Sequence, residues 1–441
     1  MIKIAAKLAV FGGTLASAVC LTGCTYEEVL LAHSVPLTRA PASAPEHDLL
    51  DVGVVVFDSG VPEGEVAPEV KEKLMDAGTF VQVRRAESLY LAVLLRDTLQ
   101  DSAQWGSVWV TPESSTAADL DVTAKILQSD GALLRLHAKA VDATGRVWIN
   151  KDYEIETATG AFDRQRYRGL DAYQDVFNEI ANDLAAAEHR LGGSTSEVRS
   201  VAALRYAGEL SPPAFGRYVT SRKDGQYVLN RLPASGDPMF DRTQQVRQRE
   251  HVFMDTLNDY YTVFANEAEA PYDGWRQSAR EEAIAIHEEQ KSARWRTGLG
   301  VASVLASVVY GGSSGIDSFA DRFLRDSLMF MGMDLMQSAA TRRQDVKLHV
   351  AALEELSASF DNEVEPLVVE INGTQHRLSG TAEAQYEEWR DLLERMFDTE
   401  AGVGEARIYS DPDVRVHSDS AARAPAASGE GAATGEHAAA R

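Results

Sequence analysis

Polar and apolar residues alternate along a stretch in the first half of the chain. The alternation runs through 120–126 and continues through 134–140, and strand-like segments follow at 147–149 and 153–155, with glycine-containing turns at 129–131 and 142–145. A period of two is typical of strands that bury one face and expose the other. The pattern therefore predicts a meander of at least three antiparallel strands.

The segments around this meander predict a sheet that is covered by helices. Residues 52–57 form a continuous apolar run, as expected of a buried strand, and 105–110 has the pattern of a short strand. Apolar residues recur at helical spacing in 84–100 and again in 171–190. This order of elements predicts an α/β sandwich over 49–191, with a mostly antiparallel sheet and helices on one face.

The middle of the chain is mainly helical by pattern. An irregular connection, which begins with a Gly-Gly-Ser-Thr-Ser linker and is rich in proline and glycine, covers 192–242. Apolar residues then recur at helical spacing in four segments: 244–268, 275–295, 319–340 and 344–362. We therefore expect an antiparallel helical domain over 243–362.

A compact α+β piece is expected after the helical domain, over 363–409. Asn372-Gly373 between two apolar segments predicts a tight β-hairpin, and a helix with an apolar stripe is expected to start at Thr381. The tail, 410–441, is rich in alanine, serine and glycine and is expected to be disordered. The fold class expected for the whole chain is therefore α+β.

The amino terminus has the features of a secretory signal. A basic start and an apolar core precede Leu21-Thr22-Gly23-Cys24, and this pattern predicts a cleaved signal over 1–23 rather than a spanning helix. The four residues Leu21–Cys24 resemble the lipobox of bacterial lipoproteins. The resemblance implies that Cys24 is lipidated and that the anchor lies in the outer membrane, facing the periplasm. The prolines and small residues that follow predict a tether over 24–48. The alternative is an ordinary signal with a chance cysteine.

The predicted meander carries a second resemblance. The segment DLDVTAKILQSDGALLRLHAKAVDATGRVWINKDYE is similar to the sheet of small periplasmic domains in envelope proteins, namely the curli-secretion lipoprotein and the amino-terminal domain of the Tol-system propeller protein. The likeness covers about residues 50–190 and lies in the pattern, so it transfers no active-site residue. It implies a module that binds other envelope proteins.

Composition excludes several classes of function. The formal net charge is −24, which disfavours nucleic acid as a partner because nucleic-acid binding requires a basic footprint. The only cysteines are Cys20, which leaves with the signal, and Cys24. The mature chain is therefore expected to use no disulfide, no zinc–thiolate site and no thiol nucleophile.

One motif suggests an enzyme. Gly311-Gly312-Ser313-Ser314-Gly315 matches G-x-S-x-G, the turn that exposes the nucleophilic serine of many hydrolases. The surrounding hundred residues read as helices, whereas that turn belongs to a parallel α/β sheet. His349 and His376 follow Ser313 without a specific spacing. A serine hydrolase is therefore kept as an alternative, and the protein is expected not to be an enzyme.

The run 297–316 contains no charged residue and allows two interpretations. A membrane span needs ~20 predominantly apolar residues, and serines and glycines dilute this run. Packing within the protein or between copies is favoured; contact with the bilayer, in an oligomeric secretion component, is the alternative. The candidate contact residues are Gly298, Val301, Leu305, Val309, Phe323, Met329 and Met333.

The remaining candidates predict no cofactor and no metal. Asp119, Asp121 and Asp130 lack the spacing of a calcium loop, and His251 and His287 lie on charged helices, where we expect them to be solvated. The tryptophans are expected in the core or on the sheet face: Trp105, Trp109 and Trp148. The leading hypothesis is a lipid-anchored, non-enzymatic adaptor for envelope proteins, either as a monomer or as a homo-oligomer.

Overall fold

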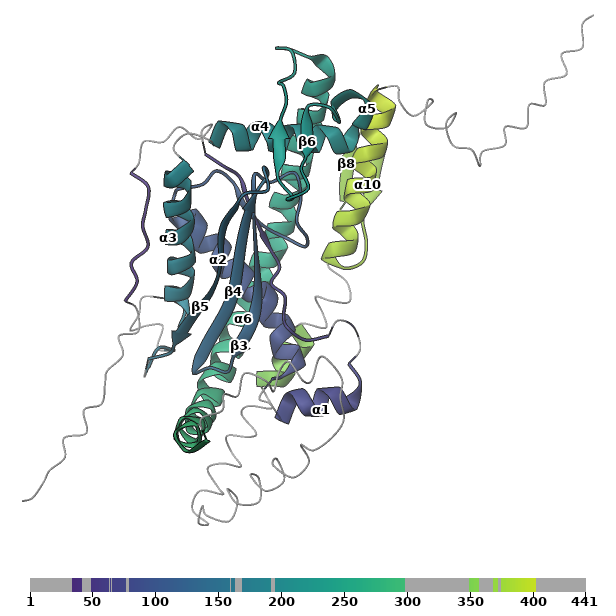
Figure 1. Cartoon of the computed structure of the whole chain (residues 1–441). Helices are drawn as coiled ribbons and strands as arrows, with labels where there is room; N and C mark the ends of the chain where they lie inside the picture. Colours follow the sequence, from purple (N-terminus) through teal and green to yellow (C-terminus); the bar gives the residue numbers. More distant parts are fainter. Residues whose placement is uncertain are drawn as a thin grey trace, which may run out of the picture.

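The computed structural model describes most of the chain between residues 34 and 401. The described residues are 34–41, 49–62, 64, 66–76, 79–158, 160–162, 169–191, 195–297, 349–356, 368–371 and 374–401. They form one five-stranded sheet, two small hairpins and a set of helices, one of which runs the full height of the sheet (Figure 1).

The sheet is mixed. Its strands are β1 (Val52–Val55), β2 (Val108–Thr111), β3 (Leu120–Ser129), β4 (Leu133–Asp142) and β5 (Val147–Glu156), in the order β2-β1-β3-β4-β5. β1 is parallel to both β2 and β3, whereas β3, β4 and β5 are antiparallel, as the meander predicts. The expectation of a mostly antiparallel sheet is therefore wrong for the β1 half, where a crossover helix joins β1 to β2 and makes the two strands parallel.

Helices cover one face of the sheet. α2 (Val81–Asp101) and α3 (Gln174–Leu191) pack on the face that buries alternate residues of β3 and β4, such as Val122 and Leu136; in Figure 1 α2 passes behind the strands and α3 lies to their left. The other face of β3, β4 and β5 carries the intervening residues, most of which are polar and all of which are at least partly exposed. We call it the open face: Asp121, Thr123, Lys125, Arg135, His137, Lys139, Asn150, Asp152 and Glu154.

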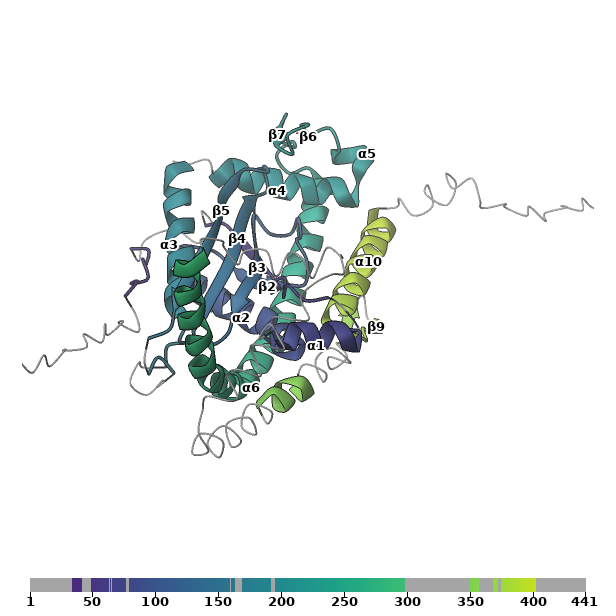
Figure 2. The same cartoon turned by 60° about the horizontal axis from the view of Figure 1, so that its bottom comes forward.

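One end of the sheet is capped by elements that the sequence pattern did not predict. α4 (Thr195–Leu210), α5 (Pro212–Phe215) and the hairpin of β6 (Val219–Ser221) and β7 (Tyr227–Leu229) gather there in both views (Figures 1 and 2). The prediction of an irregular connection is wrong for α4, which buries Val198, Val201 and Leu204 at helical spacing. The prolines and glycines that follow this helix obscured its pattern.

The long helix α6 (Pro238–Thr297) replaces the two helices expected in this region. It continues through Pro271, although proline normally kinks or breaks a helix, and it bends in its second half (Figures 1 and 2). Tyr272, Trp275 and Arg276 directly after the proline are buried. Their packing against α2 and the sheet explains why the helix continues.

The last described elements are a hairpin and a helix, and the helix packs on α6. The hairpin of β8 (Val368–Ile371) and β9 (Thr374–Arg377) confirms the predicted hairpin strands, and α10 (Ala382–Ala401) starts after Thr381, whose hydroxyl accepts a 3.2 Å bond from Ala384 N. Phe253 stacks on Trp389 of α10 at 5.1 Å. One buried cluster thus extends from Leu50 to Phe397, across the boundaries expected at 191, 242 and 362.

Candidate functional site

The functional residues expected from the sequence lie outside the described residues. These are Cys24, Ser313, Gly298, Val301, Leu305, Val309, Phe323, Met329 and Met333. Among the helices that the structure describes, none is long and apolar enough to cross a bilayer. The candidate site must therefore be sought in the described fold.

The open face presents charges that are fixed by one another. Arg135 Nη2 lies 2.9 Å from Asp152 Oδ2, and His137 Nδ1 lies 2.7 Å from Asp152 Oδ1 on the neighbouring strand. Hydrogen bonds from His137 and from Arg135 lower the pKa of Asp152. Lys125 pairs with Asp58 at 2.7 Å. The face therefore carries exposed charges of both signs that lie in ion pairs.

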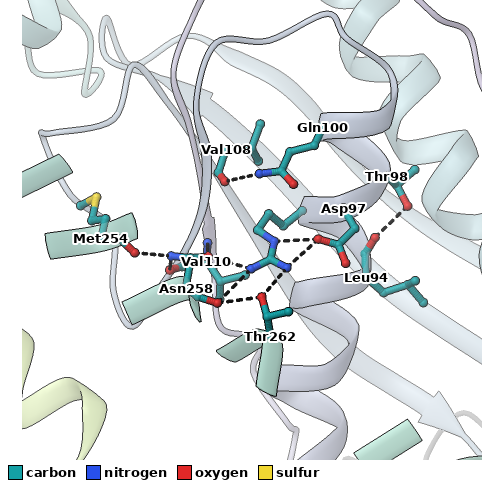
Figure 3. Close-up of polar contacts among 10 residues, drawn as sticks. Leu94, Asp97, Thr98, Gln100, Val108, Val110, Met254, Asn258 and Thr262 are labelled. Carbon is teal, nitrogen blue, oxygen red and sulfur yellow. Dashed lines mark hydrogen bonds and ion pairs between the residues drawn. The ribbon is translucent and has the colours of Figure 1, made fainter. Parts of the chain in front are cut away.

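The edge of the sheet at β2 is closed by α6, as Figure 3 shows. Val110 N donates to Asn258 Oδ1 at 2.7 Å, and Asn258 Nδ2 donates to Val110 O at 2.9 Å. The side-chain amide thus pairs with the strand as a neighbouring strand would. Arg96 of α2 donates to Asn258 Oδ1 at 3.1 Å and to Thr262 Oγ1 at 3.1 Å, which holds the amide in place. An edge strand covered in this way does not recruit another strand.

The loop between β2 and β3, residues 112–119, is also held by α6. Arg247 Nη2 donates to Ala117 O at 2.7 Å and to Asp119 Oδ1 at 3.0 Å. His251 Nε2 lies 3.0 Å from Ala117 O, and the ring packs on Trp109 with centroids 4.6 Å apart. Burial and the nearby Arg247 lower the pKa of His251. The expectation of a solvated His251 is therefore wrong, because the loop covers it.

The three tryptophans expected in the core or on the sheet face are buried. Trp105, Trp109 and Trp148 are each exposed by less than a tenth, and this prediction is confirmed. Trp109 Nε1 donates to Asp255 Oδ1 at 2.7 Å, so this side chain also ties β2 to α6.

A cavity of about 440 Å³ lies at the α4 end of the open face. Thr123, Lys139 and Val141 of the sheet lie on one side, and loop 112–119 contributes Ser114 and Ser115. Arg205 of α4 and Tyr227 of β7 complete the wall; the guanidinium of Arg205 stacks on the Tyr227 ring at 4.0 Å and donates to Ala143 O at 2.8 Å. The cavity is thus built from four separate parts of the chain.

Asp121 is the unusual group in this cavity. It pairs in register with Gly53 of β1, and a Cβ on Gly53 would lie 3.0 Å from Asp121 Oδ1. Within the described part of the chain, Asp121 Oδ1 and the nearby Thr111 Oγ1 are buried and have no hydrogen-bond partner. Burial raises the pKa of Asp121 to about 7, against the opposing effects of Arg205, Ser115 and Ser114.

The other carboxylates at this end of the sheet are satisfied. Asp119 bonds to Arg247 and accepts from Asp51 N at 3.0 Å. Asp142 accepts from Thr144 N at 2.8 Å and from Trp148 Nε1 at 2.8 Å. Within the described ranges no three His, Cys, Asp or Glu side chains form a group that could hold a metal ion. These two carboxylates therefore hold loops together.

A second cavity, of about 320 Å³, lies between α4, α6 and α10. Its lining is acidic, and Arg390 Nη2 bridges to Glu209 Oε2 at 3.1 Å. Glu250 inside it accepts from Tyr386 OH at 2.8 Å and from Ser115 Oγ at 3.1 Å. These bonds join the three helices to loop 112–119, which explains the cavity residues as part of the scaffold.

Comparisons with known proteins assign the chain to no family. No protein-family model matches the chain, and neither the curated proteins nor the solved structures contain a significant match. The resemblance of 50–190 to periplasmic envelope domains therefore stays a prediction. Sequence reasoning named Asp121 only as a poor calcium ligand and missed Thr111 and Arg205. The available signal was Gly53, a residue without a side chain inside an apolar strand.

Proposed function

We propose that this protein is a lipid-anchored, periplasm-facing, non-enzymatic adaptor that binds envelope proteins through the open face of its sheet. The observation that carries the proposal is the open face itself. Three strands present polar side chains on it, and in the described chain α4 approaches this face only at the cavity end, through Arg205. An antiparallel sheet commonly exposes one face to solvent, but the open face of this sheet also holds its charges in pairs.

Fixed pairs favour recognition for an entropic reason. A side chain that is free in solution loses ~0.5–1.5 kcal/mol when an interface immobilises it. Arg135, His137 and Asp152 are already held by mutual contacts of 2.7 and 2.9 Å, so a partner would order them at lower cost. Their alternating charges also supply a pattern that a complementary surface would match.

The described part of the expected tether supports an anchor close to the fold. Ser34 N donates to Asp175 Oδ2 at 2.5 Å, and Asn178 Nδ2 donates to Val35 O at 2.8 Å, so this segment lies along α3. If Cys24 carries the lipid, only the ten residues 24–33 separate it from α3. Ten residues span at most ~35 Å. The adaptor would therefore work near the membrane surface.

Photo-crosslinking in cells tests the docking face. A photoreactive residue is placed at Asn150 or Glu154 on the open face, and at the exposed His189 of α3 or Asp259 of α6 as controls. We expect a discrete adduct with an envelope protein from the first two positions alone. Equal adducts from all four positions, or none from the open face, would contradict the proposal. An adduct of two copies of this chain would instead favour the homo-oligomer.

Membrane fractionation tests the anchor. Cys24→Ser, expressed with a cleavable signal, is expected to become fully soluble because lipid is the proposed attachment. A variant that stays in the membrane after a carbonate wash would contradict lipid as the only anchor. That result would favour the alternative in which residues 297–336 contact the bilayer.

A further inference from the structure

The cavity at Asp121 has the dimensions of a binding pocket. Its volume of about 440 Å³ is on the order of fifteen times the ~30 Å³ that one water occupies in the liquid. A single buried water therefore does not account for it. The cavity opens on the open face, so any protein that docks on this face passes over its mouth.

Asp121 offers an acceptor that the fold does not use. A buried carboxylate oxygen without a hydrogen bond is costly, and native proteins usually satisfy such groups. Here the neighbouring strand position is Gly53, so no side chain of β1 covers Asp121 Oδ1. Thr111 Oγ1 lies 3.8 Å from the position that a Cβ on Gly53 would take, and it is a second buried polar atom without a partner in the described chain. Together these atoms form an unused polar spot.

The charged groups around Asp121 belong to several elements. Asp119 and Asp142 are held by bonds within the fold, as described above. The Arg205 charge lies against the Tyr227 ring and Ala143 O, so it is already engaged. Lys139 of β4 and Asp224 of the hairpin are exposed at the rim. Asp121 is bonded by Ser115 and Ser114 and lies near the Arg205 charge, but it is the carboxylate in the cavity that keeps one oxygen without a partner in the described chain.

We propose that the cavity receives the guanidinium or ammonium group of a basic side chain from the docked partner, which forms an ion pair with Asp121. This assignment rests on the proposed adaptor function. Charge supports it, because the chain has a net charge of −24 and attracts cationic partners over long range. An anionic group in the same position would meet the Asp121 carboxylate instead.

The pKa of Asp121 gives the ion pair a pH signature. With a pKa of about 7, the carboxylate is mostly protonated at pH 6 and mostly ionised at pH 8. A cation binds the ionised form, so its affinity is expected to rise about tenfold between these two pH values. Bound cation should in turn lower the pKa of Asp121.

Carboxyl NMR of the purified mature chain tests the site directly. The probe is acetyl-Gly-Arg-Gly-amide, and the matched control is the same peptide with citrulline, which has the shape of arginine without its charge. We expect the arginine peptide to move the Asp121 carboxyl signal and lower its pKa. Equal effects of both peptides, or tighter binding of the same peptide with glutamate in place of arginine, would overturn the proposal.

Two variants test whether the peptide binds at Asp121, and the small amine agmatine tests whether the ligand is a protein side chain. Asp121→Asn keeps the shape of the side chain and is expected to weaken the arginine peptide at least tenfold, whereas Asp259→Asn, an exposed carboxylate on α6, should not. Agmatine is the test for a small ligand: if it binds more tightly than the peptide, the assignment to a protein side chain is wrong. If the open face forms crosslinks but the peptide does not bind, only the cation site at Asp121 is overturned. If the peptide binds but no crosslinks form, only the proposed adaptor function is overturned.

Discussion

The carboxylates at the two ends of β3 differ in how many hydrogen bonds they receive. At the Ser129 end, Asp171 receives two bonds from Arg276, at 2.9 and 2.7 Å, and a third from Tyr90 OH at 2.9 Å. At the Leu120 end, Asp121 leaves Oδ1 without a partner in the described chain. Asp171 is thus bonded at both oxygens, whereas Asp121 keeps one oxygen without a partner; at the Ser129 end, Glu87 Oε2 and Arg84 Nη1 also lack a hydrogen bond in the described chain. Asp121 also lines a cavity, and this combination, more than burial itself, indicates a site kept for a ligand.

The paired end is part of the scaffold. Glu87 is fully buried there and accepts from Tyr272 OH and Ser129 Oγ, while Arg84 Nε lies 3.7 Å from its Oε2. The turn between β3 and β4 also approaches α6 closely at Gly131, where an added Cβ would fall 2.2 Å from Arg276 O. Glycine is needed at this position because of that contact and because its φ is +82°. The cluster therefore fastens α6 to the sheet.

The largest expected effect comes from breaking the paired end. Asp171→Ala should lower the free energy of unfolding by about 3–5 kcal/mol, because it leaves the Arg276 charge buried without its main partner. Urea unfolding at neutral pH measures the change. The double variant Asp171→Leu with Arg276→Met removes both charges and should recover a large part of the loss. A loss below about 1 kcal/mol for Asp171→Ala would contradict this interpretation of the cluster.

A smaller loss is expected when the β2 edge is opened. Asn258→Ala leaves Val110 N and O without their bonds of 2.7 and 2.9 Å, and should destabilise the protein by about 1–3 kcal/mol. Hydrogen exchange should speed up at the Val110 amide. Thr256→Ala, on the exposed side of the same helix, is the matched control. Unchanged exchange at Val110 would show that the amide does not protect this edge.

The contrast between the two ends was only partly predictable from sequence. Alternation predicts β3 and β4 closely because every second residue of each strand is buried and therefore apolar. The alternation does not indicate which strands are neighbours. Only the structure shows that β1 lies between β2 and β3 and that Gly53 is beside Asp121. Asn258 lies 148 residues from Val110, and no local pattern reports that contact.

At the unpaired end, removing the charge should stabilise the fold. The pKa of Asp121 is raised to about 7, so the native state holds its proton above the pH at which the unfolded chain loses it. The stability that this carboxyl contributes is present below pH ~4 and is lost as pH rises toward about 7. The free energy of unfolding of Asp121→Asn should therefore exceed that of the unsubstituted protein, and the difference should grow with pH to about 1–3 kcal/mol at pH 8. Urea unfolding at pH 5 and pH 8 measures the gain; a larger gain at pH 5 would contradict the burial argument.

The smallest effect is expected on the open face beside the cavity. Asp152→Asn removes the partner of Arg135 and His137, but this pair is exposed to solvent. Exposed ion pairs contribute little, so the change in the free energy of unfolding should stay below about 1 kcal/mol. The same variant should weaken partner crosslinking from Asn150, because the fixed charge pattern is lost. A large destabilisation with unchanged crosslinking would mean that the open face serves stability, and that the contrast between a structural end and a recognition end of β3 does not hold.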